Sequence, residues 1–166
     1  MNPLETADQG SRESKHPLLD PVIASLQKEL GDNLVALVLF GSRARGDHRT
    51  DSDWDILLIA RQLPDKPFQR HLYLKRALPA DWRGRVAILA KTPAEFEAHL
   101  PALFLDIALD GMILHDTDDY VASRLARLRQ LIQEEGLYRE CRGKDLIWQW
   151  QKFPGPGRQL TWKGMT

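Results

Sequence analysis

The stretch LFGSRARGDHRTDSDWDILLI, residues 39–59, joins two apolar segments through a loop rich in Gly, Ser, Arg and Asp. The segment before the loop is LVALVLF (34–40) and the segment after it is DILLIA (55–60). Continuous apolar runs of this length are typical of strands that are buried on both faces. The quoted stretch is therefore predicted to connect two buried strands of one sheet.

Two carboxylates stand where the second strand begins. Side chains at positions i and i+2 of a strand point to the same face, so Asp53 and Asp55 are expected to project together while Trp54 points the opposite way. Two like charges this close repel each other unless a cation lies between them. Mg²⁺ commonly takes one or two protein carboxylates and completes its shell with water and phosphate oxygens. Asp53 and Asp55 are therefore candidate catalytic metal ligands for Mg²⁺, with Mn²⁺ as an alternative.

The Gly41-Ser42 step directly follows the first strand. A glycine lets the backbone come close to a bulky anion, and the N–H groups that follow it can point at phosphate oxygens. Ser42 adds a hydroxyl donor, and a helical turn starting there would direct its positive end to the same point. Arg43 and Arg45 supply full positive charges nearby. The candidate nucleotide-binding residues are thus Gly41, Ser42, Arg43 and Arg45. Ser42 is also a candidate catalytic residue, together with Asp53 and Asp55.

Each half of this pattern has an ordinary alternative. A Gly-Ser pair after a strand can be a simple turn, an Asp-x-Asp pair can be a solvated strand end, and RARGDHRTDSD can be a charge-balanced surface loop. The functional interpretation gains weight because a phosphate-type turn and a metal-type carboxylate pair occur together on adjacent strands.

The rest of the chain predicts an α/β (α+β) domain in which a mixed sheet is flanked by helices. Thr92, Pro93 and Glu95 form a helix-start pattern, and Pro101 is expected to kink or reset the helix that follows. The predicted helices cover residues 19–30, 68–78, 93–110 and 121–132, and the further predicted strands cover 85–90 and a short segment at 112–114.

The tail contains Trp148 and Trp150 two residues apart, then a Pro/Gly turn, then Leu160 and Trp162 with the same spacing. This spacing predicts a C-terminal hairpin whose two strands are those on either side of the Pro/Gly turn. Its tryptophans could stack on a nucleobase, but a structural hairpin is favoured. The predicted organisation is an N-terminal arm (1–16), a main domain (17–140) and a hairpin extension (141–166).

Composition limits the partners. The 166 residues carry 23 Lys and Arg and 23 Asp and Glu, so no overall field attracts nucleic acid or an acidic membrane. The basic residues Lys66, Arg70, Lys75 and Arg76 could form a nucleic-acid-binding helix face, although a solvated face is the favoured interpretation. No signal-peptide core or membrane-span length is found in the sequence, which predicts a cytoplasmic protein.

The spacing of the central motif resembles that of the minimal nucleotidyltransferases of the DNA polymerase beta superfamily. Gly41-Ser42 is followed by ten residues and then by Asp53-x-Asp55, with ARG at 44–46 and SD at 52–53. The likeness extends less sharply over residues 20–135 and includes DGMILHD (110–116). It does not obviously cover the Trp-rich tail.

The resemblance implies a nucleotidyltransferase fold and a reaction of the EC 2.7.7 type. An acceptor hydroxyl would attack the α-phosphorus of a nucleoside triphosphate, ATP first among them, and release pyrophosphate. Some members of the family are antitoxins that add AMP to a tyrosine of an all-helical toxin, so a helical toxin-type partner is implied as one option. The sequence names neither the nucleotide nor the acceptor, and it indicates no membrane.

One part of the family pattern is missing. A third carboxylate usually stands on a later strand, but GRVAILA places Ala87 there, and Asp81 would help only if that strand were offset. Two carboxylates still suffice to hold Mg²⁺ with a triphosphate, whereas losing a general base costs about 10²- to 10⁴-fold in rate. Two hypotheses remain: a slow nucleotidyltransferase, or a non-catalytic nucleotide-binding or partner-binding module on the same fold.

Overall fold

The computed structural model describes residues 16–166 of the chain. The predicted N-terminal arm, residues 1–16, lies outside this part of the chain except for its last residue, His16.

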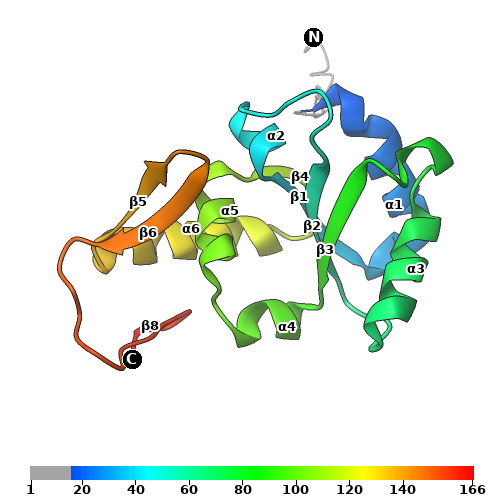
Figure 1. The fold of residues 1–166 in the computed structure, drawn as a ribbon. Coiled ribbons are helices and arrows are strands. Elements are labelled where there is room, and N and C mark those ends of the chain that lie inside the picture. Colours follow the sequence, from blue (N-terminus) through cyan, green and yellow to red (C-terminus); the bar gives the residue numbers. More distant parts are fainter. Residues whose placement is uncertain (1–15) are drawn as a thin grey trace, which may run out of the picture.

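A four-stranded mixed sheet forms the centre of the molecule (Figure 1). The strand order is β3-β2-β1-β4; β1 is antiparallel to both β2 and β4, while β3 runs parallel to β2. The predicted mixed sheet is thus confirmed, and the two apolar segments that flank the quoted loop are its two central strands. The strands are β1 (Leu34–Phe40), β2 (Trp54–Ala60), β3 (Val86–Lys91) and β4 (Met112–Asp116).

Both faces of the two central strands are covered. Along β2, Ile56 and Leu58 belong to one hydrophobic cluster, whereas Leu57 and Ile59 belong to a second cluster on the other face. All four side chains have no exposed surface. This double burial explains why the sequence shows a continuous apolar run here instead of an alternating pattern.

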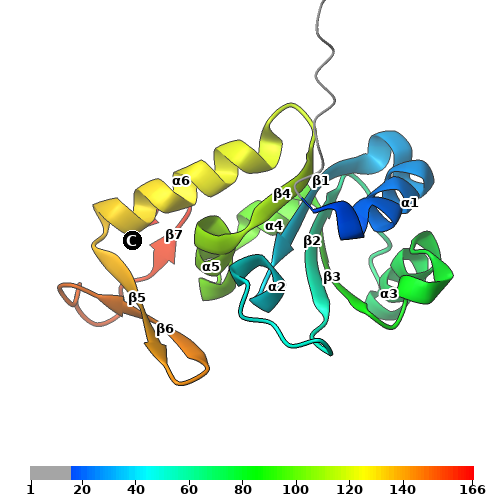
Figure 2. The ribbon, with the colours of Figure 1, turned by 90° about the horizontal axis from the view of Figure 1, so that it is seen from above.

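Helices form a layer on each side of the sheet (Figures 1 and 2). The apolar sides of α1 and α3 pack into the first cluster, and those of α4, α5 and α6 pack into the second. The α-helices are α1 (Asp20–Leu30), α2 (Ser42–Arg45), α3 (Pro67–Ala77), α4 (Pro93–Ala98), α5 (Ala102–Asp110) and α6 (Tyr120–Glu134). The short 3-10 segments are η1 (Pro17–Leu19), η2 (Gly31–Asn33) and η3 (Ala80–Trp82).

The helix-start pattern before α4 is confirmed as a capping box. Thr92 Oγ1 accepts a hydrogen bond from the Glu95 backbone N–H, and the Glu95 carboxylate accepts one from the Thr92 N–H. The chain also resets where it was expected to, because α4 ends at Ala98 and Pro101 precedes the first residue of α5.

The tail forms hairpins, but the predicted strand pairing is wrong. The strand that carries Trp148 and Trp150 pairs with the segment before it, through a tight turn at Gly143 and Lys144, and not with Leu160 and Trp162. A two-residue turn brings its flanking strands together at low entropic cost, whereas the Pro/Gly segment is a long connection. The tail strands are β5 (Leu137–Arg142), β6 (Asp145–Trp150), β7 (Leu160–Thr161) and β8 (Gly164–Met165), and the predicted boundary at residue 140 lies within β5.

The tail tryptophans have structural partners. Trp148 and Trp150 pack against the second hydrophobic cluster, and Trp148 Nε1 donates a hydrogen bond to Asp106. Trp162 stacks edge-on against Phe96 and donates to the His99 carbonyl. The structural-hairpin interpretation is therefore the one the contacts support. Separately, none of the helices in residues 16–166 is long and apolar enough to cross a membrane.

Candidate functional site

The Gly-Ser turn lies at the end of β1, where α2 begins (Figures 1 and 2). Gly41 has φ 73° and ψ −157°, a backbone conformation that is open in practice only to glycine. Ser42 is the first residue of α2, and Ser42 Oγ forms no hydrogen bond within the described part of the chain. Gly46 ends α2 in the left-handed conformation. The turn therefore presents the hydroxyl of Ser42 and the first N–H groups of a helical turn at one end of the sheet.

The turn and the second aspartate meet at one point. Phe40 pairs with Asp55 in the antiparallel ladder, so Gly41 follows directly on the partner of Asp55. A Cβ added to Gly41 would lie only 2.5 Å from Asp55 Oδ2. Any other residue would have to displace this carboxylate or the backbone. The absence of a side chain at position 41 is thus what allows the turn and the carboxylate to converge.

Asp53 is close enough to Asp55 to affect the ionisation of Asp55. Trp54, which lies between them in sequence, is buried in the first cluster, whereas Asp55 follows the face of Leu57 and Ile59. The pKa of Asp55 is raised, first by burial and then by the negative charge of Asp53. The positive charge of Arg45 opposes this rise. A cation bound beside Asp55 would therefore favour the ionised form of this carboxylate.

Arg43 holds the loop that carries Asp53. Its guanidinium donates to the backbone carbonyls of Thr50 and Ser52 at 3.0–3.2 Å and lies 4.4 Å from the centre of the Trp54 ring. These contacts use Nε and one of the two terminal nitrogens of the guanidinium. The structure thus places Arg43 as a support for the loop between α2 and β2.

Arg45 is the arginine that lies near the carboxylate pair. Besides its effect on Asp55, Arg45 is 3.3 Å from Asp47 Oδ2 and its NH1 lies 4.0 Å from Asp110 Oδ2. Its side chain is about one quarter exposed. Of the two candidate arginines, Arg45 is the one with a position suited to a phosphate contact.

Asp110 links this site to the C-terminal hairpin. Arg139 of β5 donates to both carboxylate oxygens of Asp110, at 2.6 and 2.9 Å, and to Asp106 at 3.1 Å. Asp106 also accepts from Trp148 Nε1. The sequence does not reveal these contacts, because the partners are 29 to 42 positions apart in the chain and no local motif marks them.

Ala87 occupies the position beside Asp55 on the next strand. The β2–β3 register pairs Asp55 directly with Ala87, and β3 begins at Val86, so the strand is not offset and Asp81 remains in η3 before it. Within residues 16–166, no group of three or more His, Cys, Asp or Glu side chains could hold a metal ion. The site therefore offers two carboxylates, and the rest of a Mg²⁺ shell would have to come from water and phosphate.

A cavity of about 450 Å³ adjoins Asp53 but is not lined by Asp55. It lies along the outer edge of β3, between that strand and α3. Asp53 and Ala87 contribute to one end of its wall, while His71 and Lys75 contribute from α3. Space large enough for a substrate group is thus present beside one of the two candidate metal ligands.

This combination of fold and site defines the class of protein. A glycine turn, a carboxylate pair and a mixed sheet between two helical layers form the arrangement expected for a nucleotidyltransferase fold. A family model described as "Polymerase beta, Nucleotidyltransferase" matches residues 22–119, which is more than half of the chain. The chain belongs to this family.

Comparisons with individual proteins agree with the family. "Putative protein adenylyltransferase MJ1305" of Methanocaldococcus jannaschii is 29% identical over 120 residues, covering 70% of this chain and 82% of the relative. Among solved structures, a chain of "Crystal structure of the toxin-antitoxin with AMP-PNP" has 20% identity and a TM-score of 0.50, covering 68% of this chain and 85% of that chain. This structural similarity supports the nucleotidyltransferase fold.

Proposed function

We propose that this protein transfers AMP from ATP to a hydroxyl group of a protein acceptor. The observation that carries the proposal is the convergence of Gly41 on Asp55, because it places a phosphate-type turn and a metal-type carboxylate at one point. Family membership supports the reaction type, and the M. jannaschii relative supports a protein as the acceptor.

Each residue of the site has a role in this proposal. Gly41 and Ser42 would bind the β- and γ-phosphates through backbone N–H groups and the Ser42 hydroxyl, and Arg45 would add a positive charge. Asp53 and Asp55 would hold Mg²⁺, or Mn²⁺ in its place, together with phosphate oxygens. A divalent ion bound there neutralises charge on the phosphates and aligns the attacking and leaving oxygens. Burial and the charge of Asp53 raise the pKa of Asp55, and a cation bound there would favour its ionised form.

The proposed step conserves atoms and charge. The acceptor oxygen forms a bond to the α-phosphorus while the bond from that phosphorus to the oxygen bridging the α- and β-phosphates breaks. Pyrophosphate leaves with the bonding electron pair, and the hydroxyl proton passes to solvent. Because Ala87 offers no carboxylate to accept this proton, the reaction is expected to be slow relative to a site with a positioned base.

The alanine at position 87 also favours a second candidate, a module that binds nucleotide without transferring it. Ala87 removes a group needed for catalysis but none needed for binding a Mg²⁺–triphosphate complex. In either case a helical toxin-type protein is a proposed partner, with the toxin–antitoxin complex among the structural neighbours as the reason to test it.

The test uses ATP labelled at the α-phosphate, Mg²⁺ and cell extract, with the other three nucleotides for comparison. We expect label on protein with the wild-type chain, about 10²-fold less with Asp53→Asn/Asp55→Asn, and none after chelation of the metal. Asp51→Asn is the matched control, because Asp51 is an exposed carboxylate of the same loop.

The outcomes separate the two candidates. Mg²⁺-dependent ATP binding without transfer would replace the transferase with the binding module. Neither binding nor transfer would remove the nucleotide assignment. The Asp53→Asn/Asp55→Asn variant should keep its thermal stability, since it removes the repulsion between two like charges.

A further inference from the structure

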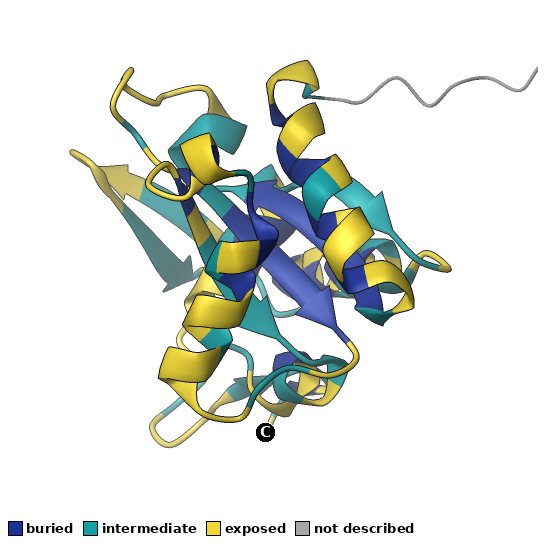
Figure 3. Cartoon of the chain, turned by 90° about the vertical axis from the view of Figure 1, so that its right-hand side faces the viewer, coloured by how far each residue is buried: buried dark blue, intermediate teal, exposed yellow. Residues whose placement is uncertain are grey.

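Helix α3 has an exposed apolar and basic stripe along one side. Phe68, His71, Leu72 and Lys75 follow the spacing i, i+3, i+4, i+7, so they share one face of the helix. Phe68 is 71% exposed and Leu72 is 37% exposed. Figure 3, which views the molecule from the side of α1 and α3, shows the outer faces of these helices as largely exposed over the buried strands. Solvent-facing apolar side chains in a row indicate a contact surface.

The same stretch of chain is basic. Helix α3 contains Arg70, Lys75 and Arg76 and no acidic residue. Glu95 neutralises Arg70, whereas Lys75 and Arg76 form no ion pair within residues 16–166. Lys75 instead donates to the Arg83 carbonyl, which leaves its positive charge uncompensated at the wall of the cavity. A partner that covers this face is therefore expected to be acidic.

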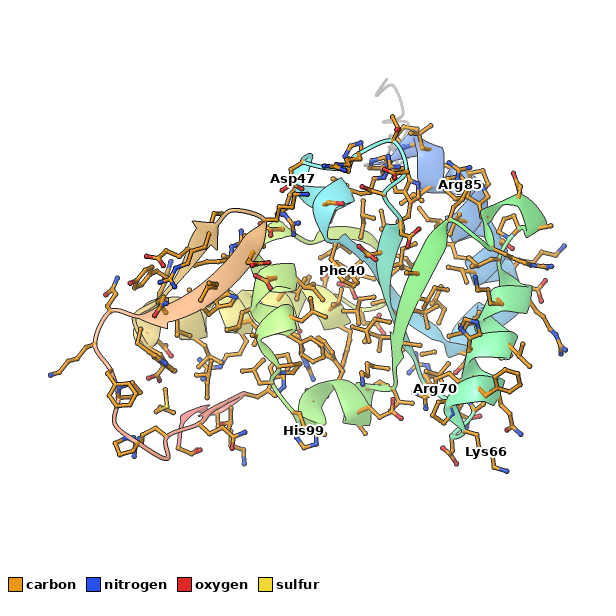
Figure 4. All side chains as sticks on the ribbon, viewed as in Figure 1. Phe40, Asp47, Lys66, Arg70, Arg85 and His99 are labelled. Carbon is orange, nitrogen blue, oxygen red and sulfur yellow. The ribbon has the colours of Figure 1, made fainter. Side chains whose placement is uncertain are left out.

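The cavity connects this stripe to Asp53, one of the two candidate metal ligands. His71 and Lys75 of the stripe line it on one side, Ile88 of β3 lines it on the other, and Asp53 and Ala87 also contribute to its wall. No described strand pairs with the outer edge of β3. Figure 4 shows Arg85 just before the start of β3, near the loop between α2 and β2, and Arg70 and Lys66 toward the opposite end of that strand. A side chain that enters beside α3 can thus approach Asp53 without displacing a secondary-structure element.

The geometry of phosphoryl-group transfer indicates that the acceptor approaches from the β3 side of β2. The attacking and leaving oxygens lie roughly in line on opposite sides of the phosphorus. In the strand order, β1 with its Gly41 turn lies on one side of β2, and β3 with Ala87 lies on the other. If the turn at Gly41 holds the leaving pyrophosphate, the attacking hydroxyl must arrive from the β3 side, where the cavity lies.

We propose that the α3 stripe, Phe68, His71, Leu72 and Lys75, is the docking surface for an acidic protein segment that places its acceptor hydroxyl in the β3 cavity. The proposal rests on the nucleotidyltransferase function proposed above and names the side from which the acceptor enters. A protein is favoured over RNA because two exposed positions of the stripe, Phe68 and Leu72, are apolar and the chain has no net positive charge.

The test measures binding before it measures transfer. The probe is a fluorescein-labelled random copolymer of Glu and Tyr, which combines negative charge with phenolic hydroxyls, and its anisotropy is followed as the protein is added. Phe68→Glu places an acid in the stripe and is expected to weaken binding about tenfold or more. The matched control is Phe153→Glu, because Phe153 is 70% exposed in the loop after β6. This control is expected to bind as the wild type does.

A second measurement keeps this inference separate from the proposed function. The affinity for Mg²⁺–ATP should be the same in Phe68→Glu and in the wild type, since Phe68 does not belong to the phosphate site. Equal copolymer binding by the two Glu variants, or no binding by the wild type, would overturn the docking surface even if ATP binds. Stronger binding of a Lys–Tyr copolymer or of poly(U) would show that the partner is not an acidic protein. Loss of ATP binding in the wild type would instead count against the proposed function.

Discussion

At the scale of single residues, Gly41 is the position of the site where the structure most requires a glycine. Its positive φ strains any side-chain-bearing residue, and its missing Cβ leaves room for Asp55 Oδ2. These two effects can be separated, because Gly46 also has a positive φ but has open space around the position of a Cβ. Gly41 therefore combines a positive φ with a close approach to the Asp55 carboxylate.

We expect Gly41→Ala to lower the free energy of unfolding by about 1–3 kcal/mol and to weaken Mg²⁺–ATP binding at least tenfold. The second effect follows because the new methyl group displaces the Asp55 carboxylate. Urea denaturation and titration with a fluorescent ATP analogue measure the two effects. Gly46→Ala should lower the free energy of unfolding by about 1 kcal/mol and leave the ATP affinity unchanged. Equal losses of ATP affinity in both variants would mean that the contact with Asp55 is irrelevant.

At the scale of elements, the ion pair between Arg70 and Glu95 joins α3 to the start of α4. Arg70 donates to both carboxylate oxygens at 2.8 and 2.9 Å, and Glu95 also completes the capping box with Thr92. The hydrogen bond from Arg70 is the main reason that the pKa of Glu95 is lowered to about 2. The ionised carboxylate thus holds one helix against the next.

Because the pKa of Glu95 in the folded protein lies below its ordinary value of 4.5, the stabilisation it provides is present above pH 4.5. It is lost as the pH falls from 4.5 toward 2. Glu95→Gln keeps the hydrogen-bonding capacity of the cap but removes the charge. We expect it to lower the free energy of unfolding by about 1 kcal/mol at pH 7, a modest loss because the side chain is partly exposed. Urea unfolding at pH 7 and pH 3 should show this loss shrinking at the lower pH, whereas Glu29→Gln, at an exposed position of α1, should be neutral at both; a pH-independent loss would contradict the charge explanation.

At the scale of the whole molecule, the C-terminal hairpin is joined to the nucleotidyltransferase domain through Arg139. This guanidinium bridges Asp106 and Asp110, and Asp110 in turn faces Arg45 of the site. The side chains of Arg139, Asp106 and Asp110 are all at most 20% exposed. The tail is thus bound to the element beside the candidate site by polar contacts as well as by its tryptophans.

Replacing Arg139 with Gln should lower the free energy of unfolding by about 2–3 kcal/mol, because two partly buried carboxylates lose their shared positive partner. The control is Arg142→Gln on the same strand, where Arg142 forms an exposed ion pair with Glu140. Exposed pairs of this kind contribute about 0–1 kcal/mol, so the control should change little. Urea denaturation followed by tryptophan fluorescence measures both variants. Similar small losses of unfolding free energy in both would show that these polar contacts do not hold the hairpin to the domain.

Much of the central fold could be predicted because its signals are local. Strands buried on both faces must be apolar at every position, which made β1 and β2 recognisable from a few residues each. The capping box before α4 and the reset at Pro101 also depend on neighbouring residues alone. The predicted closeness of Asp53 and Asp55, with Trp54 on the other face, follows from the twofold period of a strand.

Other features depended on which distant segments met, and no local pattern encodes that. Arg43 and Arg45 are equivalent in sequence. In the structure, Arg43 donates to the carbonyls of its own loop, whereas Arg45 faces the carboxylates, because the folded loop passes over Arg43 only. The tail strands paired with different partners from those predicted, since an alternating segment can pair with any strand edge that lies nearby. The sequence by itself therefore determined the strands, the turn and the carboxylate pair, whose causes lie within a few residues. Only the tertiary structure decided the roles of the arginines, the joint at Arg139 and the groove beside β3, because these depend on contacts between residues far apart in the chain.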